Sequence, residues 1–284
     1  MDTSPHEATI RAMDAAFSGM ATTSEPAHRP YSFLKALGRK SLPHEIVVRE
    51  NRYTKQCVFK NDFFAITAMY HGEHEKVILK VARDAGLFGI PLRWIGRLLA
   101  AREAAFLQSL SGVHGIPRFI SRWGPTGVVR QFVDGHPLHR GEQVENEFHS
   151  RLKHLVEIIH ARGMAYVDLE KCENVLVGDD GLPYLFDFQI AWHLPAKWGG
   201  ELFPARWLRC WFQAGDRYHL LKLQRRTRPD QLSAEVIAAS YRRPWYLRIH
   251  GLIARPWKWL RRAILKLLEP GHEHASGERG RMLD

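Results

Sequence analysis

Short apolar runs separated by polar turn residues dominate the first half of the chain. Gln56 to Lys60 and Phe63 to Tyr70 are β-rich and are separated by Asn61-Asp62, a pair typical of hairpin turns. A further apolar run, Lys76 to Ala82, follows a short polar stretch. The pattern therefore predicts a three-stranded antiparallel meander.

A second hairpin is expected where Phe119 to Trp123 and Val128 to Val133 flank the turn sequence Gly124-Pro-Thr-Gly127. It would complete a five-stranded sheet. Two other segments have helical periodicity. Apolar residues recur every three or four positions from Pro91 to Leu110 and from Glu145 to Arg162, where Gly163 follows as a stop signal.

The apolar runs Val175 to Val177 and Tyr184 to Phe186 flank an Asp-Asp-Gly turn and predict a tight hairpin. Because a hairpin returns its ends to neighbouring positions, Asp168, Asn174 and Asp187 should converge at its open end. Oxygen ligands of this kind suit Mg²⁺. Taken singly, each residue could equally be a loop cap or a turn starter.

The order Asp168-Leu, Asn174, hairpin, Asp187-Phe resembles the protein-kinase superfamily pattern H-R-D-L-x-x-x-N followed by D-F-G. Tyr166 stands where the family has His, and Gln189 replaces the Gly after Asp-Phe. Five residues, rather than the family's four, separate Asp168 from Asn174. These departures favour divergent bacterial kinase-like proteins, among them lipopolysaccharide-core sugar kinases and RIO-like kinases.

The resemblance implies an α+β, two-lobe protein-kinase-like fold. The N-lobe would be a small antiparallel β-sheet with one main helix, and the C-lobe would be larger and helical. It also implies ATP and Mg²⁺ as cofactors. Asp168 would orient or deprotonate an acceptor hydroxyl, and Lys171 in the same loop is assigned with it to catalysis. Asn174 and Asp187 would hold the metal.

Lys80 lies inside the apolar strand Lys76 to Ala82, where an unpaired ammonium group would be costly to bury. The resemblance implies that it binds nucleotide phosphates and pairs with Glu103 of the next helix. Otherwise, Lys80 would be an edge-strand lysine and Glu103 a solvated helix charge. Gln131 and Val133 match the backbone segment that binds adenine in the family.

Two features leave the kinase interpretation incomplete. No Gly-x-Gly-x-x-Gly lies between the first two strands, so a short loop of backbone amides near Lys60, or a poorer cover, must face the phosphates. This absence, with Tyr166 and Gln189, favours the alternative of a catalytically silent scaffold. Asp216 could either brace the catalytic loop or cap a helix.

Composition indicates one soluble, compact unit. The chain has 284 residues, of which 45% are hydrophobic. Met1 to Pro30 lacks the apolar core of a signal peptide, and no run is long enough to cross a membrane. The three Cys residues form no disulfide or zinc pattern, which favours the cytoplasm. The expected divisions are a flexible segment 1–30, lobes at 31–133 and 134–270, and a polar tail 271–284.

The net charge of +11 is concentrated towards the C-terminus. Trp257 to Leu268 predicts an amphipathic helix with Lys258, Arg262 and Lys266 on its polar face. It would contact an anionic membrane surface or pack as the last lobe helix. No nucleic-acid motif accompanies the charge. The expected acceptor is a hydroxyl of lipopolysaccharide core or another envelope glycolipid, with protein Ser/Thr second. The expected location is cytoplasmic, including the inner face of the cytoplasmic membrane.

Overall fold

The computed structural model describes residues 35–86, 91–195 and 198–241. The chain divides into two compact units, Met1–Thr227 and Arg228–Asp284. In the second unit, the described part contains a short 3-10 helix, Pro229–Gln231, and α5, Ala234–Tyr241. All other elements belong to the first unit. The predicted division at residues 133 and 134 stays a prediction.

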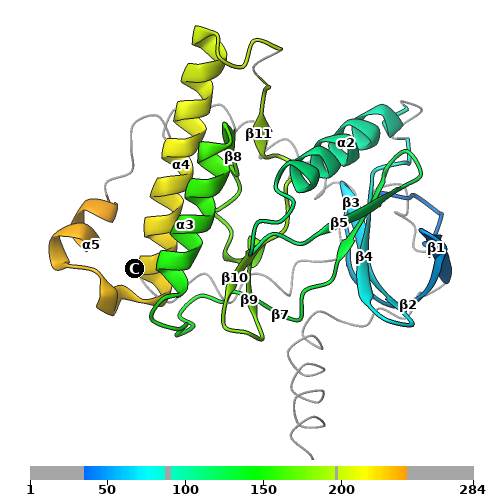
Figure 1. The fold of residues 1–284 in the computed structure, drawn as a ribbon, viewed down its shortest axis with the longest axis horizontal. Coiled ribbons are helices and arrows are strands. Elements are labelled where there is room, and N and C mark those ends of the chain that lie inside the picture. Colours follow the sequence, from blue (N-terminus) through cyan, green and yellow to red (C-terminus); the bar gives the residue numbers. More distant parts are fainter. Residues whose placement is uncertain (1–34, 87–90, 196–197, 242–284) are drawn as a thin grey trace, which may run out of the picture. The chain divides into compact units, whose positions relative to one another are not determined.

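A six-stranded antiparallel sheet forms the first part of this unit (Figure 1). Its spatial order is β1-β2-β3-β4-β6-β5. The strands are β1 Glu45–Val48, β2 Asn51–Asn61, β3 Ala65–Gly72, β4 Lys76–Ala82, β5 Phe119–Trp123 and β6 Gly127–Gln131. The predicted meander and second hairpin are confirmed, and the five-strand prediction is wrong by one strand.

The sequence pattern did not predict β1 or the early start of β2, for two reasons. The first half of β2 is rich in polar residues, so its pattern does not show a buried face. The turn between the strands uses Arg49 and Glu50, whose φ values are 47° and 71°. Hairpin turns that need positive φ usually contain Asn or Gly. Neither signal therefore marked this hairpin in the sequence.

Both faces of strand β4 are buried. Val77, Leu79 and Val81 of β4 belong to a cluster within the sheet that includes Tyr53 and Tyr70. Ala82 faces the other way, into a second cluster to which helices, short strands and loops contribute. Because side chains alternate along a strand, Lys80 also points to this second side. The alternation places Lys80 between the sheet and the helices.

Three helices contribute to the second cluster: α2 Arg93–Ser109, α3 Phe148–Ala161 and, through Leu223, α4 Phe203–Thr227. Gly96 lets α2 approach the end of β4, since a Cβ atom there would lie 1.9 Å from the carbonyl oxygen of Arg83. The helices predicted at residues 91–110 and 145–162 are confirmed with slightly shorter bounds. The sheet followed by helices confirms the predicted α+β class.

Two small sheets lie near the helices (Figure 1). The predicted hairpin is present as β9 Val175–Gly178 and β10 Pro183–Leu185, and β7 Gly135–Pro137 pairs with β9. The pair β8 Met164–Ala165 and β11 Trp192–His193 aligns the chain before Asp168 with the chain after Asp187. This second pairing was not predicted, because strands of two residues carry no periodicity.

Three expectations fall on residues outside the described ranges: the segment 1–30, the helix Trp257 to Leu268 and the tail 271–284. Among the described helices, none combines the length and apolar composition needed to cross a membrane. The described cysteines Cys57, Cys172 and Cys210 are all free thiols.

Candidate functional site

Lys80 is the centre of a buried ion cluster. Its Nζ atom lies 3.1 Å from Oε2 of Glu103 and 2.9 Å from Oδ1 of Asp187. The side chains of Lys80 and Glu103 are only 9% and 1% exposed. Strand β4 and helix α2 therefore bring together the lysine and glutamate that the sequence paired, and Asp187 joins them. Their roles towards a nucleotide stay predictions.

The cluster fixes the charge states of its members. Burial alone would raise the pKa of the Asp187 carboxyl, but the Lys80 ammonium outweighs burial and lowers this pKa to about 2. Burial would lower the pKa of Lys80, and the two carboxylates outweigh it and raise that pKa. At neutral pH the Lys80–Asp187 contact is consequently a full ion pair.

Acid should weaken the fold through Asp187. Because its pKa is depressed from 3.8 to about 2, the ionised carboxylate stabilises the folded state above about pH 4. That contribution, on the order of 2 kcal/mol, is lost as the pH falls towards 2. Urea unfolding of wild type and Asp187→Asn between about pH 6 and pH 2.5 measures it. The stability difference should shrink with acid, and a constant difference would contradict the assignment.

Arg130 is a member of this site that the sequence reasoning missed. It lies in β6, is 7% exposed, and its guanidinium carbon is 5.3 Å from the Phe186 ring centroid. The Lys80 and Arg130 charges both oppose the rise in the pKa of Glu103 that burial causes. A signal was available, because Arg130 interrupts an apolar strand just as Lys80 does. The same argument about buried cations applies to both.

Asp216 holds the backbone of the loop that carries Asp168. Its side chain accepts hydrogen bonds from the backbone amides of Tyr166 and Val167, each at 2.8 Å, and from Nε2 of His160 at 2.9 Å. Val167 has a φ of 73°, a region that β-branched residues rarely adopt. The brace predicted as one role of Asp216 is therefore present, and Asp216 lies inside α4 rather than at its N-cap.

The loop itself is held by short internal contacts. Asn174 Nδ2 donates to the carbonyl oxygen of Asp168 at 2.9 Å, and Lys171 Nζ lies 2.8 Å from Asp168 Oδ2. Tyr166 is fully buried, and its hydroxyl donates to the Asn174 carbonyl oxygen at 3.3 Å. Burial, then the charges of Asp187 and Asp168, raise the pKa of this phenol well above its usual value. Tyr166 is therefore a protonated donor that supports the loop.

The residues present fit a magnesium ion. Both hydrogen bonds that the structure gives the Asp187 side chain fall on Oδ1, which leaves Oδ2 for a cation. Asn174 donates its amide nitrogen within the loop, which leaves its amide oxygen for a cation. In the described ranges no group of three or more His, Cys, Asp or Glu could hold a metal. Mg²⁺ needs only one or two protein ligands where phosphates and water supply the others.

The expected phosphate cover is poor. In the turn between β2 and β3, the backbone amides of Phe64 and Ala65 donate hydrogen bonds to Oδ1 of Asp62, at 2.8 and 2.9 Å. Lys60 forms an ion pair with Asp62 at 3.0 Å. Its charge also helps to lower the pKa of Asp187. Lys60 is therefore the cation this hairpin offers near the cluster.

The expected adenine segment is partly engaged. The amide of Gln131 donates to the carbonyl oxygen of Arg118 at 2.9 Å, and the carbonyl oxygen of Gln131, the group expected to face adenine, accepts from Nη1 of Arg130 at 3.5 Å. Among the described residues, none forms a backbone hydrogen bond with Val133 in the structure. Val133 is therefore the better candidate of the two for contacting a nucleobase through its backbone.

No protein-family model matches the chain, and no curated protein matches its sequence. Two solved structures are similar: the Rio2 kinase from Chaetomium thermophilum and a Rio2 kinase-ADP/Mg²⁺-phosphoaspartate complex from the same organism. The first is 17% identical with a TM-score of 0.45, covering 60% of this chain and 56% of that chain. The second is 16% identical with a TM-score of 0.45, covering 73% and 69%. The chain thus spans little more than half of the first kinase. From its own strands and helices, the chain has an α+β fold, in which an antiparallel sheet is followed by helices and the Lys80 ion cluster joins β4 to α2.

Proposed function

We propose that the protein is an ATP- and Mg²⁺-dependent phosphotransferase that phosphorylates a hydroxyl group. The observation that carries the proposal is the buried Lys80 ammonium shared between Glu103 and Asp187. A buried lysine held by two carboxylates is costly for a purely structural role. It is suited to a site where an anionic phosphate takes over one of its contacts.

The residues have distinct roles in this reaction. Lys80, oriented by Glu103, binds the α- and β-phosphates, and Asn174 and Asp187 hold Mg²⁺. When bound, the metal neutralises charge on the phosphate oxygens. Asp168 Oδ2 accepts the proton of the acceptor hydroxyl while the oxygen of that hydroxyl forms a bond to the γ-phosphorus. The bond from that phosphorus to the β-phosphate oxygen breaks, and ADP leaves.

Lys171 has a supporting role in the transfer. Its ammonium group lies 2.8 Å from Asp168 Oδ2 and is largely exposed, so it can reach an incoming phosphate. A cation beside the γ-phosphate stabilises the charge that spreads over its oxygens during transfer. The nucleobase would lie against the backbone of Val133 and the carbonyl of Gln131.

The acceptor that we propose is lipopolysaccharide core or another envelope glycolipid. Support comes from the basic, Trp-rich C-terminal sequence, in which Trp257 to Leu268 has an amphipathic pattern. The protein would then act at the inner face of the cytoplasmic membrane. Protein Ser/Thr is the second acceptor.

A silent scaffold is the second candidate function, and one observation favours it. Asp62 occupies the two turn amides that could otherwise contact a phosphate, and it adds a negative charge there. Such a protein would retain the Lys80 cluster as a fixed part of its fold and would transfer no phosphate.

Phosphate transfer from γ-labelled Mg-ATP tests the proposal. Purified protein is incubated with lipopolysaccharide, with a mixed protein substrate, or alone, and the labelled product is counted. Label on the glycolipid is expected with wild type and should fall to background with Asp187→Asn. Asp179→Asn, in the exposed hairpin turn, is the matched control and should behave as wild type. Label on protein alone would select the second acceptor, and no label anywhere would favour the scaffold.

A further inference from the structure

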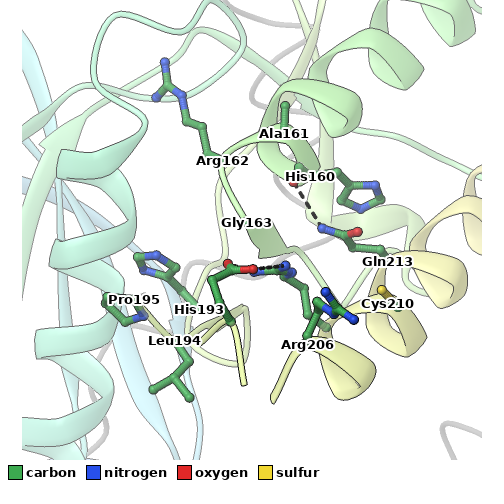
Figure 2. A pocket seen from close by; sticks show the side chains of 12 residues that line it. His160, Ala161, Arg162, Gly163, His193, Leu194, Pro195, Arg206, Cys210 and Gln213 are labelled. Carbon is green, nitrogen blue, oxygen red and sulfur yellow. Dashed lines mark hydrogen bonds and ion pairs between the residues drawn. The ribbon is translucent and has the colours of Figure 1, made fainter. Parts of the chain in front are cut away.

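A cavity of about 510 Å³ lies apart from the Lys80 cluster, and none of the cluster residues lines it. Figure 2 shows its walls, which come from the end of α3, the segment after β11 and the first half of α4. His193 reaches it from one side, and Arg206, Cys210 and Gln213 of α4 lie on the opposite side (Figure 2). The proposed phosphotransfer gives this cavity no role.

The lining is cationic. Arg162, Arg206 and Arg209 contribute three guanidinium groups, against the single carboxylate of Glu201. Glu201 is already bound by Arg209, with oxygen to nitrogen distances of 2.7 and 3.1 Å. Arg162 donates to the carbonyl oxygen of Ser109 and points away from Arg206 in Figure 2. Among the described residues, no carboxylate forms an ion pair with Arg206.

Next to the cavity, the chain exposes large apolar side chains. We call this the α4 surface, and its members with their exposed fractions are Trp198 72%, Leu202 65%, Phe203 74% and Trp207 47%. Phe203 and Trp207 are four residues apart on α4 and therefore share one face. The first turns of α4 extend beyond the end of α3 (Figure 1). Glu201 and Arg206, which line the cavity, lie between members of the α4 surface in the sequence.

A large exposed apolar patch beside a charged pocket marks an interaction site. We propose that the cavity and the α4 surface together bind an anionic phospholipid of a bilayer. Arg206 would contact the headgroup phosphate, because a guanidinium group matches phosphate oxygens with paired donors. Trp198, Leu202, Phe203 and Trp207 would lie in the interfacial layer, where tryptophan and other aromatic residues are favoured.

The positive charge of the protein favours an anionic bilayer, rather than a second copy of the chain, as the partner of the α4 surface. The protein carries a net charge of +11, so two copies repel each other, whereas an anionic membrane attracts each of them. The proposal does not depend on phosphate transfer, because no nucleotide takes part in it. It adds a defined membrane contact on α4 that is separate from the C-terminal sequence.

Co-sedimentation with vesicles tests the proposal. The full chain is mixed with phosphatidylcholine vesicles that contain or lack phosphatidylglycerol, without nucleotide. Wild type should bind the anionic vesicles, less at high salt. The double substitution Phe203→Ser, Trp207→Ser should weaken binding at least tenfold because it removes the interfacial side chains. Arg206→Gln should weaken it about fivefold, the loss of one cation near an anionic surface.

Matched controls come from α2, where Trp94 is 62% exposed and Arg97 is also exposed. Trp94→Ser and Arg97→Gln should bind vesicles as wild type does. Arg206→Gln, Trp94→Ser and Arg97→Gln should melt at the wild-type temperature, because these side chains are exposed. The double variant loses the contact between the rings of Trp207 and Trp211, whose centroids are 4.2 Å apart, so vesicle binding is compared at a temperature where circular dichroism shows it folded. Equal vesicle binding by wild type and the folded double variant would overturn the proposal.

Two further readouts distinguish other occupants. Stabilisation by inorganic phosphate that disappears in Arg206→Gln, without vesicle binding by wild type, would assign the cavity to a free anion. Size-exclusion chromatography that shows a dimer abolished by Phe203→Ser, Trp207→Ser would assign the α4 surface to a second copy. Either result would overturn the bilayer assignment. Failure of phosphate transfer alone would leave it intact.

Discussion

Replacing Asp168 by Asn should lower the rate of phosphate transfer by a factor of about 10²–10⁴, the usual contribution of a general base. The amide keeps the shape of the side chain but cannot accept the hydroxyl proton. The loop should persist, because Asn174 donates to the backbone oxygen of Asp168 and not to its side chain. Affinity for Mg-ATP should therefore stay within about twofold of wild type, since the base contacts the acceptor and not the nucleotide.

Rate and affinity are measured together by single-turnover transfer and nucleotide titration. Asp179→Asn makes the same chemical change in the exposed turn of the β9–β10 hairpin and serves as the control. Wild-type turnover in Asp168→Asn would remove Asp168 from its proposed role. Loss of nucleotide affinity in parallel with the rate would instead assign Asp168 to binding.

Replacing Asp216 by Ala should destabilise the protein by about 3–5 kcal/mol, the cost of breaking a buried charged contact. The substitution leaves the buried amide of Tyr166, the amide of Val167 and Nε2 of His160 without their acceptor. Release of Val167 from its strained backbone conformation, which costs roughly 1–3 kcal/mol to maintain, would offset part of this loss and let the loop change its shape. The loop that carries Asp168 should then lose its geometry, so activity should fall together with stability.

Chemical unfolding of purified variants checks this expectation. Asp216→Asn keeps one acceptor oxygen and should lose less stability than Asp216→Ala. Glu147→Ala removes an exposed carboxylate that pairs with Arg151 across one helical turn, and it should cost less than about 1 kcal/mol. A loss of similar size in Asp216→Ala and Glu147→Ala would mean that Asp216 does not hold the loop.

The sequence predicted those parts of the fold in which periodicity and turn chemistry agree. The strand around Lys80 alternates between two buried faces, and the helices α2 and α3 repeat their apolar residues at helical spacing. β1 escaped prediction because its turn, Arg49-Glu50, lacks the usual residues for positive φ. The two-residue strands β8 and β11 escaped because tertiary pairing alone defines them.

The sequence predicted site residues where a charged residue lies within an otherwise apolar strand. Lys80 and its partner Glu103 followed from that contrast together with the family resemblance. Arg130 is also a charged residue in an apolar strand, but it has no counterpart in the protein-kinase motifs, so it was not predicted as a member of the site. The attachment of Asp187 to Lys80 and the left-handed backbone of Val167 depend on long-range contacts. No local pattern of residues encodes such contacts.

The central claim is that the buried cluster around Lys80 binds a magnesium nucleotide. Calorimetric titration of the protein with ATP, with and without Mg²⁺, tests it most directly. We predict binding by wild type that requires Mg²⁺ and is lost in Asp187→Asn, while the variant remains folded at neutral pH. Absence of binding by folded wild-type protein, or equal affinity in Asp187→Asn, would contradict the account.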